Sequence, residues 1–239
     1  MRNILLVIPV LLTLFVFGCD TTQIAQRIDD FKARTNLGDG EIAAGLKEAL
    51  VSGISKGADQ ASKRDGYFRN ALIKLDLPPE IKKIEGLLNR VGLEDVIDQF
   101  VENLNRGAEK AATEAKPIFL SAIKSMTLTD AKSILYGKND EATQFLKRTT
   151  FPQLVEKFNP IIQRALKDVN ATKYYSTIIN SYNKIPGLPA VNSDLDGYAT
   201  EKAIDGLFKL IANEEANIRE NPFARTSELL KKVFARVGN

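Results

Sequence analysis

From Gly40 onward, apolar residues recur at the spacing of an α-helix along almost the whole chain. In the first such stretch, Ile42, Leu46 and Leu50 follow one another every four residues, and Ile54 and Ala58 continue the row. Residues three and four apart share one face of a helix, whereas the faces of a strand alternate residue by residue. No segment shows that alternation over a strand's length. The pattern predicts an all-α fold, a single compact domain of about eight or nine helices, some of them kinked at proline.

A second row on the same stretch contains only small residues. It consists of Gly45, Ala49, Gly53, Gly57 and Ala61. A glycine inside a helix destabilises it by about 1 kcal/mol relative to alanine. Such a row is favourable where another helix packs closely, and we expect it to be a packing face. Close approach of a ligand is the other interpretation.

Proline, glycine and capping signals divide the rest of the chain into further elements. Pro79 suits the first position of a helix, and Thr127 with Asp130 is typical of an N-terminal cap. Residues 72–79 are predicted to be an extended connector and 185–192 a surface loop. The predicted helices cover 79–91, 93–126 with a kink near Pro117, 127–137, 140–148, 152–169 with a kink at Pro160, 172–183, 195–220 and 227–236.

The N-terminus has the pattern of a bacterial export signal. Arg2 precedes an apolar run from Ile4 to Phe17, which is shorter than the ~20 residues that span a bilayer. Gly18 then stands before Cys19, the only cysteine in the chain. This pattern predicts a lipoprotein signal peptide over 1–18 and lipidation of Cys19. An ordinary secretory signal and a short membrane anchor are the alternatives.

Lipidation of Cys19 predicts where the protein works. Residues 19–38 would be the lipidated cysteine and a polar tether, and 39–239 the all-helical domain. Fully extended, the tether would reach about 60 Å. We expect the protein in the bacterial cell envelope, facing the periplasm or the outer surface, with the membrane as its partner through the anchor.

Composition excludes several kinds of chemistry. The chain has no histidine and no tryptophan, and after processing its one cysteine would carry lipid. A Ser-His-Asp triad, the usual histidine-containing zinc site and iron–sulfur clusters are therefore excluded. We expect no cofactor and no metal. The net charge is +3 with both signs interleaved, so we also expect no nucleic-acid partner.

Seven polar residues are the candidates for a site, and no catalytic residue is assigned among them. Glu214 and Glu215 lie where the apolar stripe of the helix over 195–220 is interrupted, and Arg219 is placed to pair with Glu215. Asn105 and Glu109 are expected to flank the core, with Arg148 and Arg225 as further candidates. These residues form either a polar pocket or a structural network of ion pairs and caps.

Each interpretation carries its own function. The leading prediction is a non-enzymatic binding or interaction module whose protein or envelope ligand is unknown. The alternative is a carboxylate-dependent hydrolase acting on an envelope substrate such as a glycan. The segment from Asn192 to Gly197 imitates half of a calcium loop, but Ala203 stands where the bidentate glutamate belongs. We expect Asp194 or Asp196 to cap a helix there.

Several blocks of sequence carry a resemblance to a known family. They are Asn105-Arg-Gly-Ala-Glu-Lys-Ala, Ile118-Phe119, Ala122-Ile-Lys-Ser-Met-Thr, Asp130-Ala-Lys-Ser-Ile-Leu-Tyr-Gly137, Ala142-Thr143, Arg148-Thr-Thr, Gly206-Leu-Phe208, Glu214-Glu215-x-x-Ile-Arg219-x-Asn-Pro222 and Arg225-Thr226. From about Ala43 to Val237 the chain resembles an uncharacterised family of exported bacterial proteins, often lipoproteins, catalogued as a domain of unknown function. Gly107 stands where the family usually has alanine. The resemblance implies an all-helical fold and an exported setting, and it brings no catalytic residues.

Overall fold

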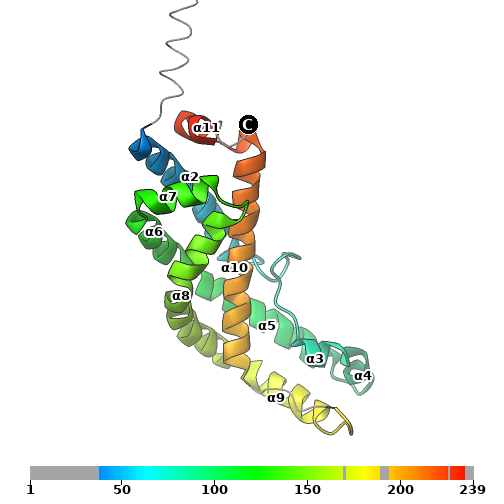
Figure 1. The fold of residues 1–239 in the computed structure, drawn as a ribbon. Helices are drawn as coiled ribbons and strands as arrows, with labels where there is room; N and C mark the ends of the chain where they lie inside the picture. The colour runs from blue at the N-terminus through cyan, green and yellow to red at the C-terminus, as the bar shows by residue number, and fades with distance from the viewer. Residues whose placement is uncertain (1–37, 169–170, 189–193, 226, 235–239) are drawn as a thin grey trace, which may run out of the picture. The chain divides into compact units, whose positions relative to one another are not determined.

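The computed structural model describes residues 38–168, 171–188, 194–225 and 227–234. They form part of one compact unit, Leu37–Asn239. Within them the fold is all-helical and has no strand, as predicted (Figure 1). Its helices are α2 (Asp39–Ala61), α3 (Pro79–Lys82), α4 (Glu85–Arg90), α5 (Glu94–Ala112), α6 (Ala115–Ser125), α7 (Leu128–Tyr136), α8 (Glu141–Asp168), α9 (Ala171–Tyr182), α10 (Leu195–Glu220) and α11 (Glu228–Phe234), with a 3₁₀ turn η1 (Pro222–Ala224). Cys19 and the predicted signal and tether, except Gly38, lie outside the described residues.

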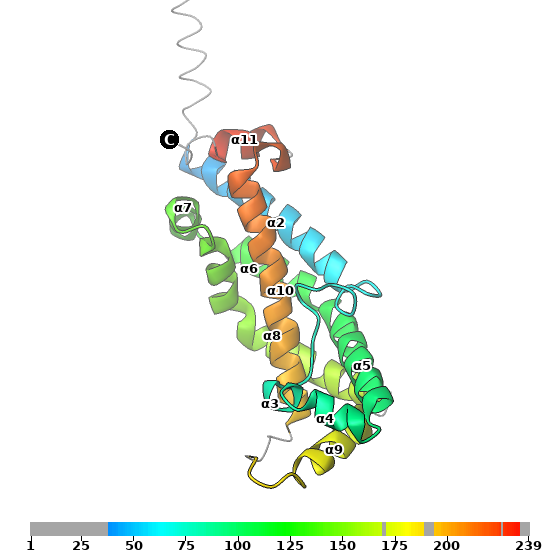
Figure 2. The ribbon, with the colours of Figure 1, turned by 90° about the vertical axis from the view of Figure 1, so that its right-hand side faces the viewer.

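The two long helices α8 and α10 form the centre of the domain. Helix α10 packs on α8, α2 and α5, and α8 also packs on α5 and α6 (Figure 2). Aromatic pairs join further helices: Phe119 of α6 and Phe208 of α10 meet edge to face, and Phe100 of α5 and Tyr175 of α9 are stacked. None of the helices in the described ranges is long and apolar enough to span a membrane.

The small-residue row of α2 is a packing face, as predicted. All of its members are buried. A Cβ atom added to Gly53 would lie 3.5 Å from the Cβ atom of Glu214, and one added to Gly57 would lie 3.5 Å from that of Leu210, both on α10. At Gly45 the added atom would lie only 2.7 Å from a methyl group of Val233 on α11. The row therefore lets α2 pack closely against α10 and α11.

A non-helical segment, residues 62–78, joins α2 to α3. Asp65 has a φ of +67°, which turns the chain sharply after α2 ends. Pro79 begins α3 as predicted, at a position where no backbone N–H is needed. The predicted helix over 79–91 is interrupted between α3 and α4, and Gly92 with a φ of +83° closes it.

The helix predicted over 93–126 is two helices, α5 and α6. They separate at Thr113 and Glu114, four and three residues before Pro117. Proline has no N–H for the carbonyl four residues earlier, and its ring clashes with that carbonyl. The break therefore falls at Thr113, one turn earlier than the proline itself.

The interruption predicted before Pro152 is wrong, because α8 runs unbroken from Glu141 to Asp168 with Pro152 and Pro160 inside it. Leu146 and Leu154 on either side of Pro152 are fully buried, so packing holds the helix across the missing hydrogen bond. Figure 1 shows α8 following a bent path, as expected for a helix that contains prolines.

Candidate functional site

Glu215 on α10 is a buried carboxylate that caps another helix. It accepts hydrogen bonds from the backbone N–H groups of Ala142 (3.0 Å) and Thr143 (2.8 Å), in the first turn of α8, and from the Thr143 hydroxyl (2.7 Å). The first N–H groups of a helix have no partner inside the helix, and a carboxylate there is also favoured by the helix dipole. Glu215 thus caps α8 from a residue far away in the chain.

Arg219, one turn further along α10, completes this cluster. Its guanidinium pairs with Glu215 at 2.8 Å and donates to the backbone oxygen of Ile134 at 2.8 Å, in the last turn of α7. The side chains of Glu215 and Arg219 are 6% and 7% exposed. Arg225 donates to the carbonyls that end α10, at Ile218 (3.1 Å) and Arg219 (2.8 Å). We call Glu215, Arg219 and Arg225 the α10 cluster. It joins the ends of three helices.

Asn105 and Glu109 on α5 hold the non-helical segment 62–78. The Asn105 amide accepts from the N–H of Leu75 and donates to the same residue's carbonyl, both at 2.8 Å. Glu109 accepts from the N–H groups of Tyr67 and Phe68, both at 3.2 Å. The expectation that these two side chains flank the core is wrong, because segment 62–78 covers them and leaves Asn105 fully buried and Glu109 nearly so.

Arg106 gathers the acidic side chains around Glu109. It contacts Glu109 at 2.9 Å, Asp65 at 2.8 Å and Glu102 at 3.1 Å. Its hydrogen bond holds the pKa of Asp65 below the ordinary value. Burial, with the nearby Glu109 carboxylate, raises the pKa of the Tyr67 hydroxyl well above its ordinary value. We call Asn105, Arg106 and Glu109 the α5 cluster. Sequence reasoning missed Arg106, although its spacing from Glu102 and Glu109 is that of helical ion pairs.

The remaining two candidates, half-buried Glu214 and exposed Arg148, lie outside these clusters. Glu214 pairs with Lys56 of α2 at 2.7 Å. Arg148 is 62% exposed and lies 3.6 Å from Glu141. The structure therefore does not bring the seven predicted residues into one pocket. Instead it divides them between the α10 cluster, the α5 cluster and two surface pairs.

The geometry of the buried carboxylates fits the structural network. Glu109 and Glu215 belong to clusters with no residue in common, and each accepts backbone N–H groups. The cavity beside Glu215 has a volume of about 20 Å³. That is roughly the space of one water molecule. Among the described residues, no group of three acidic side chains is placed to hold a metal ion.

A larger cavity lies between α8 and the first turns of α10. Its volume is about 490 Å³. One wall is a row of α8 side chains spaced four residues apart, two of them apolar and two of them amides. The other wall is formed mainly by oxygen-bearing side chains around the start of α10. The lining residues are Phe151, Val155, Asn159 and Gln163 from α8, and Asp194, Asp196, Gly197, Thr200 and Glu201 around the start of α10. We call this the α8–α10 pocket.

The imitation of a calcium loop is a helix cap, as expected. The Asp194 carboxylate accepts from the N–H of Gly197 at 2.9 Å, at the start of α10. Asn192 and Ser193 lie outside the described residues. The pocket was missed from the sequence because only its α10 side was weighed. The row of Phe151, Val155, Asn159 and Gln163 on α8 could have indicated one wall of the pocket. The depth of the pocket, however, depends on where α10 begins.

The comparisons with known proteins identify the family. Residues 36–235 match the model of a family described as "Protein of unknown function (DUF4197)". No curated protein and no solved structure matches the chain. The match spans most of the sequence and agrees with the resemblance to a domain of unknown function. The chain belongs to the DUF4197 family of proteins of unknown function.

Proposed function

We propose that this protein is a lipid-anchored binding module of the bacterial envelope, with its ligand in the α8–α10 pocket. The observation that carries the proposal is the pocket itself. Its volume of about 490 Å³ lies within the range of small-molecule sites, about 300–1,000 Å³. Such sites combine an apolar wall with a few polar groups that orient the ligand, and this pocket has both.

The lining determines the class of ligand. Asp194, Asp196 and Glu201 contribute carboxylates, and among the described residues that line the pocket there is no lysine or arginine. An anionic ligand would be repelled there. The apolar wall of Phe151 and Val155 favours a ligand with a hydrocarbon part or a sugar face. The ligand is therefore a small neutral or cationic molecule that donates hydrogen bonds.

The two buried carboxylates, Glu109 and Glu215, fit a structural role better than the hydrolytic role considered for them. A glycosidase needs two carboxylates on either side of one substrate bond, about 5–10 Å apart. Glu109 and Glu215 instead accept hydrogen bonds from the main chain of segment 62–78 and of α8 respectively. Each charge holds backbone N–H groups of one segment, 62–78 for Glu109 and the start of α8 for Glu215, so these side chains have a structural role.

The anchor follows from the N-terminal sequence. A charged residue, an apolar run and Gly18-Cys19 are the parts of a lipoprotein signal. A Cys19→Ser variant is expected to leave the membrane fraction and to lack the mass of the lipid. If it were processed normally and still fractionated with the membrane, lipidation of Cys19 would be refuted.

Native mass spectrometry of protein extracted from its own envelope tests the pocket. We expect a small-molecule adduct on the wild type that is absent from Val155→Trp, in which the indole fills the apolar half of the pocket. Val51→Trp is the matched control, since Val51 is an exposed valine of α2, away from the pocket. An adduct that survives in Val155→Trp would place the ligand elsewhere. No adduct on the wild type would refute the binding proposal.

A further inference from the structure

One end of the domain carries exposed apolar side chains from separate parts of the chain. Leu128 and Tyr136, at the two ends of α7, are 52% and 59% exposed, and Phe223 in η1 is 95% exposed. Figures 1 and 2 place α7, the end of α10 and the start of α2 together at this end. We call Leu128, Tyr136 and Phe223 the apolar end.

An ion pair and hydrogen bonds from a side chain to the backbone hold the helices of the apolar end together. Lys132 of α7 pairs with Asp39, the first residue of α2, at 2.7 Å. Arg219 of α10 donates to the carbonyls of Ile134 (2.8 Å) and Leu135 (3.4 Å), so the end of α7 lies beside the end of α10. The end of α7, which carries Tyr136, and the end of α10, which leads to Phe223, therefore lie together, although 87 positions separate the two residues in the sequence.

Phe223 is exposed on a well-defined turn. The Asn221 side chain accepts from the N–H of Phe223 at 3.0 Å, and Pro222 fixes the first residue of the turn. Arg225 then ties the turn to the end of α10. Single exposed apolar residues are ordinary on protein surfaces. A phenylalanine held almost wholly in water by a capped turn, with a tyrosine and a leucine in the same region, is a different case.

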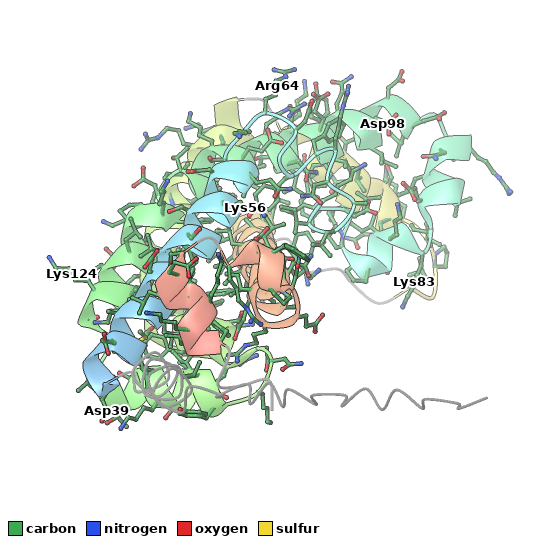
Figure 3. The ribbon with its side chains drawn as sticks, turned by 90° about the horizontal axis from the view of Figure 1, so that it is seen from above. Asp39, Lys56, Arg64, Lys83, Asp98 and Lys124 are labelled. Atoms are coloured by element: carbon green, nitrogen blue, oxygen red, sulfur yellow. The ribbon has the colours of Figure 1, made fainter. Side chains whose placement is uncertain are left out.

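The course of the chain indicates what covers this surface. Helix α2 begins at Asp39 at the apolar end, and Figure 3 looks down on this end with Asp39 labelled. The residues that precede Asp39 lead directly to Cys19. Even fully extended they reach about 60 Å. A lipid anchor at Cys19 would therefore keep this end of the domain within that distance of the bilayer.

We propose that the apolar end contacts the bilayer that holds the tether, with Phe223, Tyr136 and Leu128 at the lipid interface. Tyrosine is enriched at that depth because one end of its side chain is apolar and the other polar, and phenylalanine and leucine are typical of the apolar faces that enter the interface. The inference rests on the membrane tether of the proposed function and is independent of the α8–α10 pocket. In this arrangement the folded domain contacts the same membrane that holds its lipid anchor.

A single tryptophan tests this contact. The natural chain has none, so Phe223→Trp creates one fluorophore in the lipidated protein. In phosphatidylethanolamine–phosphatidylglycerol vesicles containing brominated lipid, we expect its emission to shift to shorter wavelength and to lose most of its intensity. Val91→Trp is the control, because Val91 is 64% exposed near α4, away from the tether. Its emission should match that of a water-exposed indole.

Vesicle flotation separates the two proposals. If the variants do not float with the vesicles, the tether is refuted and this inference with it. If they float and Phe223→Trp is quenched no more than Val91→Trp, the tether stands and the bilayer contact is refuted. A shift seen only in native envelope vesicles, and not in pure lipid, would refute the bilayer contact and assign the apolar end to a protein partner.

Discussion

Replacing Glu215 by Gln tests whether the α10 cluster is a structural network. The substitution keeps the size of the side chain and removes its charge. Its carboxylate accepts two backbone N–H groups of α8 and pairs with Arg219, whose side chain is 7% exposed. Removing one member of a buried pair leaves the other charge uncompensated and costs about 3–5 kcal/mol. The amide oxygen of Gln can still accept some of these hydrogen bonds, so we expect the free energy of unfolding to fall by about 3 kcal/mol.

The neighbouring residue provides the control. Glu214 pairs with Lys56, and the two side chains are 20% and 63% exposed, against 6% and 7% for Glu215 and Arg219. Surface pairs of this kind contribute about 0–1 kcal/mol. Urea unfolding of Glu214→Gln should therefore give nearly the free energy of the wild type, whereas the midpoint for Glu215→Gln falls clearly. Both variants should show the same denaturant slope.

A second variant tests the coupling. Arg219→Met alone removes the hydrogen bonds to the end of α7 and leaves Glu215 without its partner. In Glu215→Gln/Arg219→Met no uncompensated charge is left, so the double variant should be more stable than the two separate losses predict, by about 0.5–3 kcal/mol. If Glu215→Gln costs under about 1 kcal/mol, as expected for a surface pair, the network interpretation is refuted.

Two further predictions concern the segment that follows α2. Arg106 lowers the pKa of Asp65, so the stability that the aspartate contributes is present above its ordinary pKa of 3.8 and is lost as the pH falls through the lowered pKa. The wild type should therefore melt at a higher temperature than Asp65→Asn at neutral pH, and this difference should disappear well below pH 3.8. A difference that does not change with pH would contradict the prediction. Gly206→Ala should cost about 1–3 kcal/mol in urea unfolding, because the new Cβ atom would lie 2.9 Å from a ring carbon of Tyr67 and 3.2 Å from Cβ of Ile73. Gly40→Ala, with nothing within 4 Å of its new Cβ atom, should gain about 0.4–1 kcal/mol, and equal effects of the two substitutions would show that the fit at Gly206 is loose.

The sequence predicts those parts of the fold that depend on neighbours along the chain. The bounds of α10 agree with the predicted 195–220, because its apolar stripe and its capping aspartate are local signals. Thr127 caps α7 with Asp130 for the same reason. Pro152 was misjudged because core contacts override the local preference of proline to end a helix.

The candidate site was harder to predict because its contacts are distant in sequence. Asn105 binds Leu75, and Glu109 binds Tyr67. Both partners belong to segment 62–78, which has no periodic pattern that would show where it packs. An isolated polar residue beside an apolar stripe looks the same whether water or backbone covers it. The pairing of Glu215 with Arg219 was predictable, since both lie on one helix face, but the α8 N–H groups that Glu215 caps were not.

The capping of α8 by Glu215 has a consequence for the order in which the domain can form. The carboxylate lies 73 and 72 positions after the two N–H groups that it satisfies. A chain delivered N-terminus first therefore presents α8 without its cap until α10 has followed. Until then α8 also lacks its packing partner α10, and a product truncated before Glu215 is expected to leave the first N–H groups of α8 without this cap. The fold is completed from its C-terminal side.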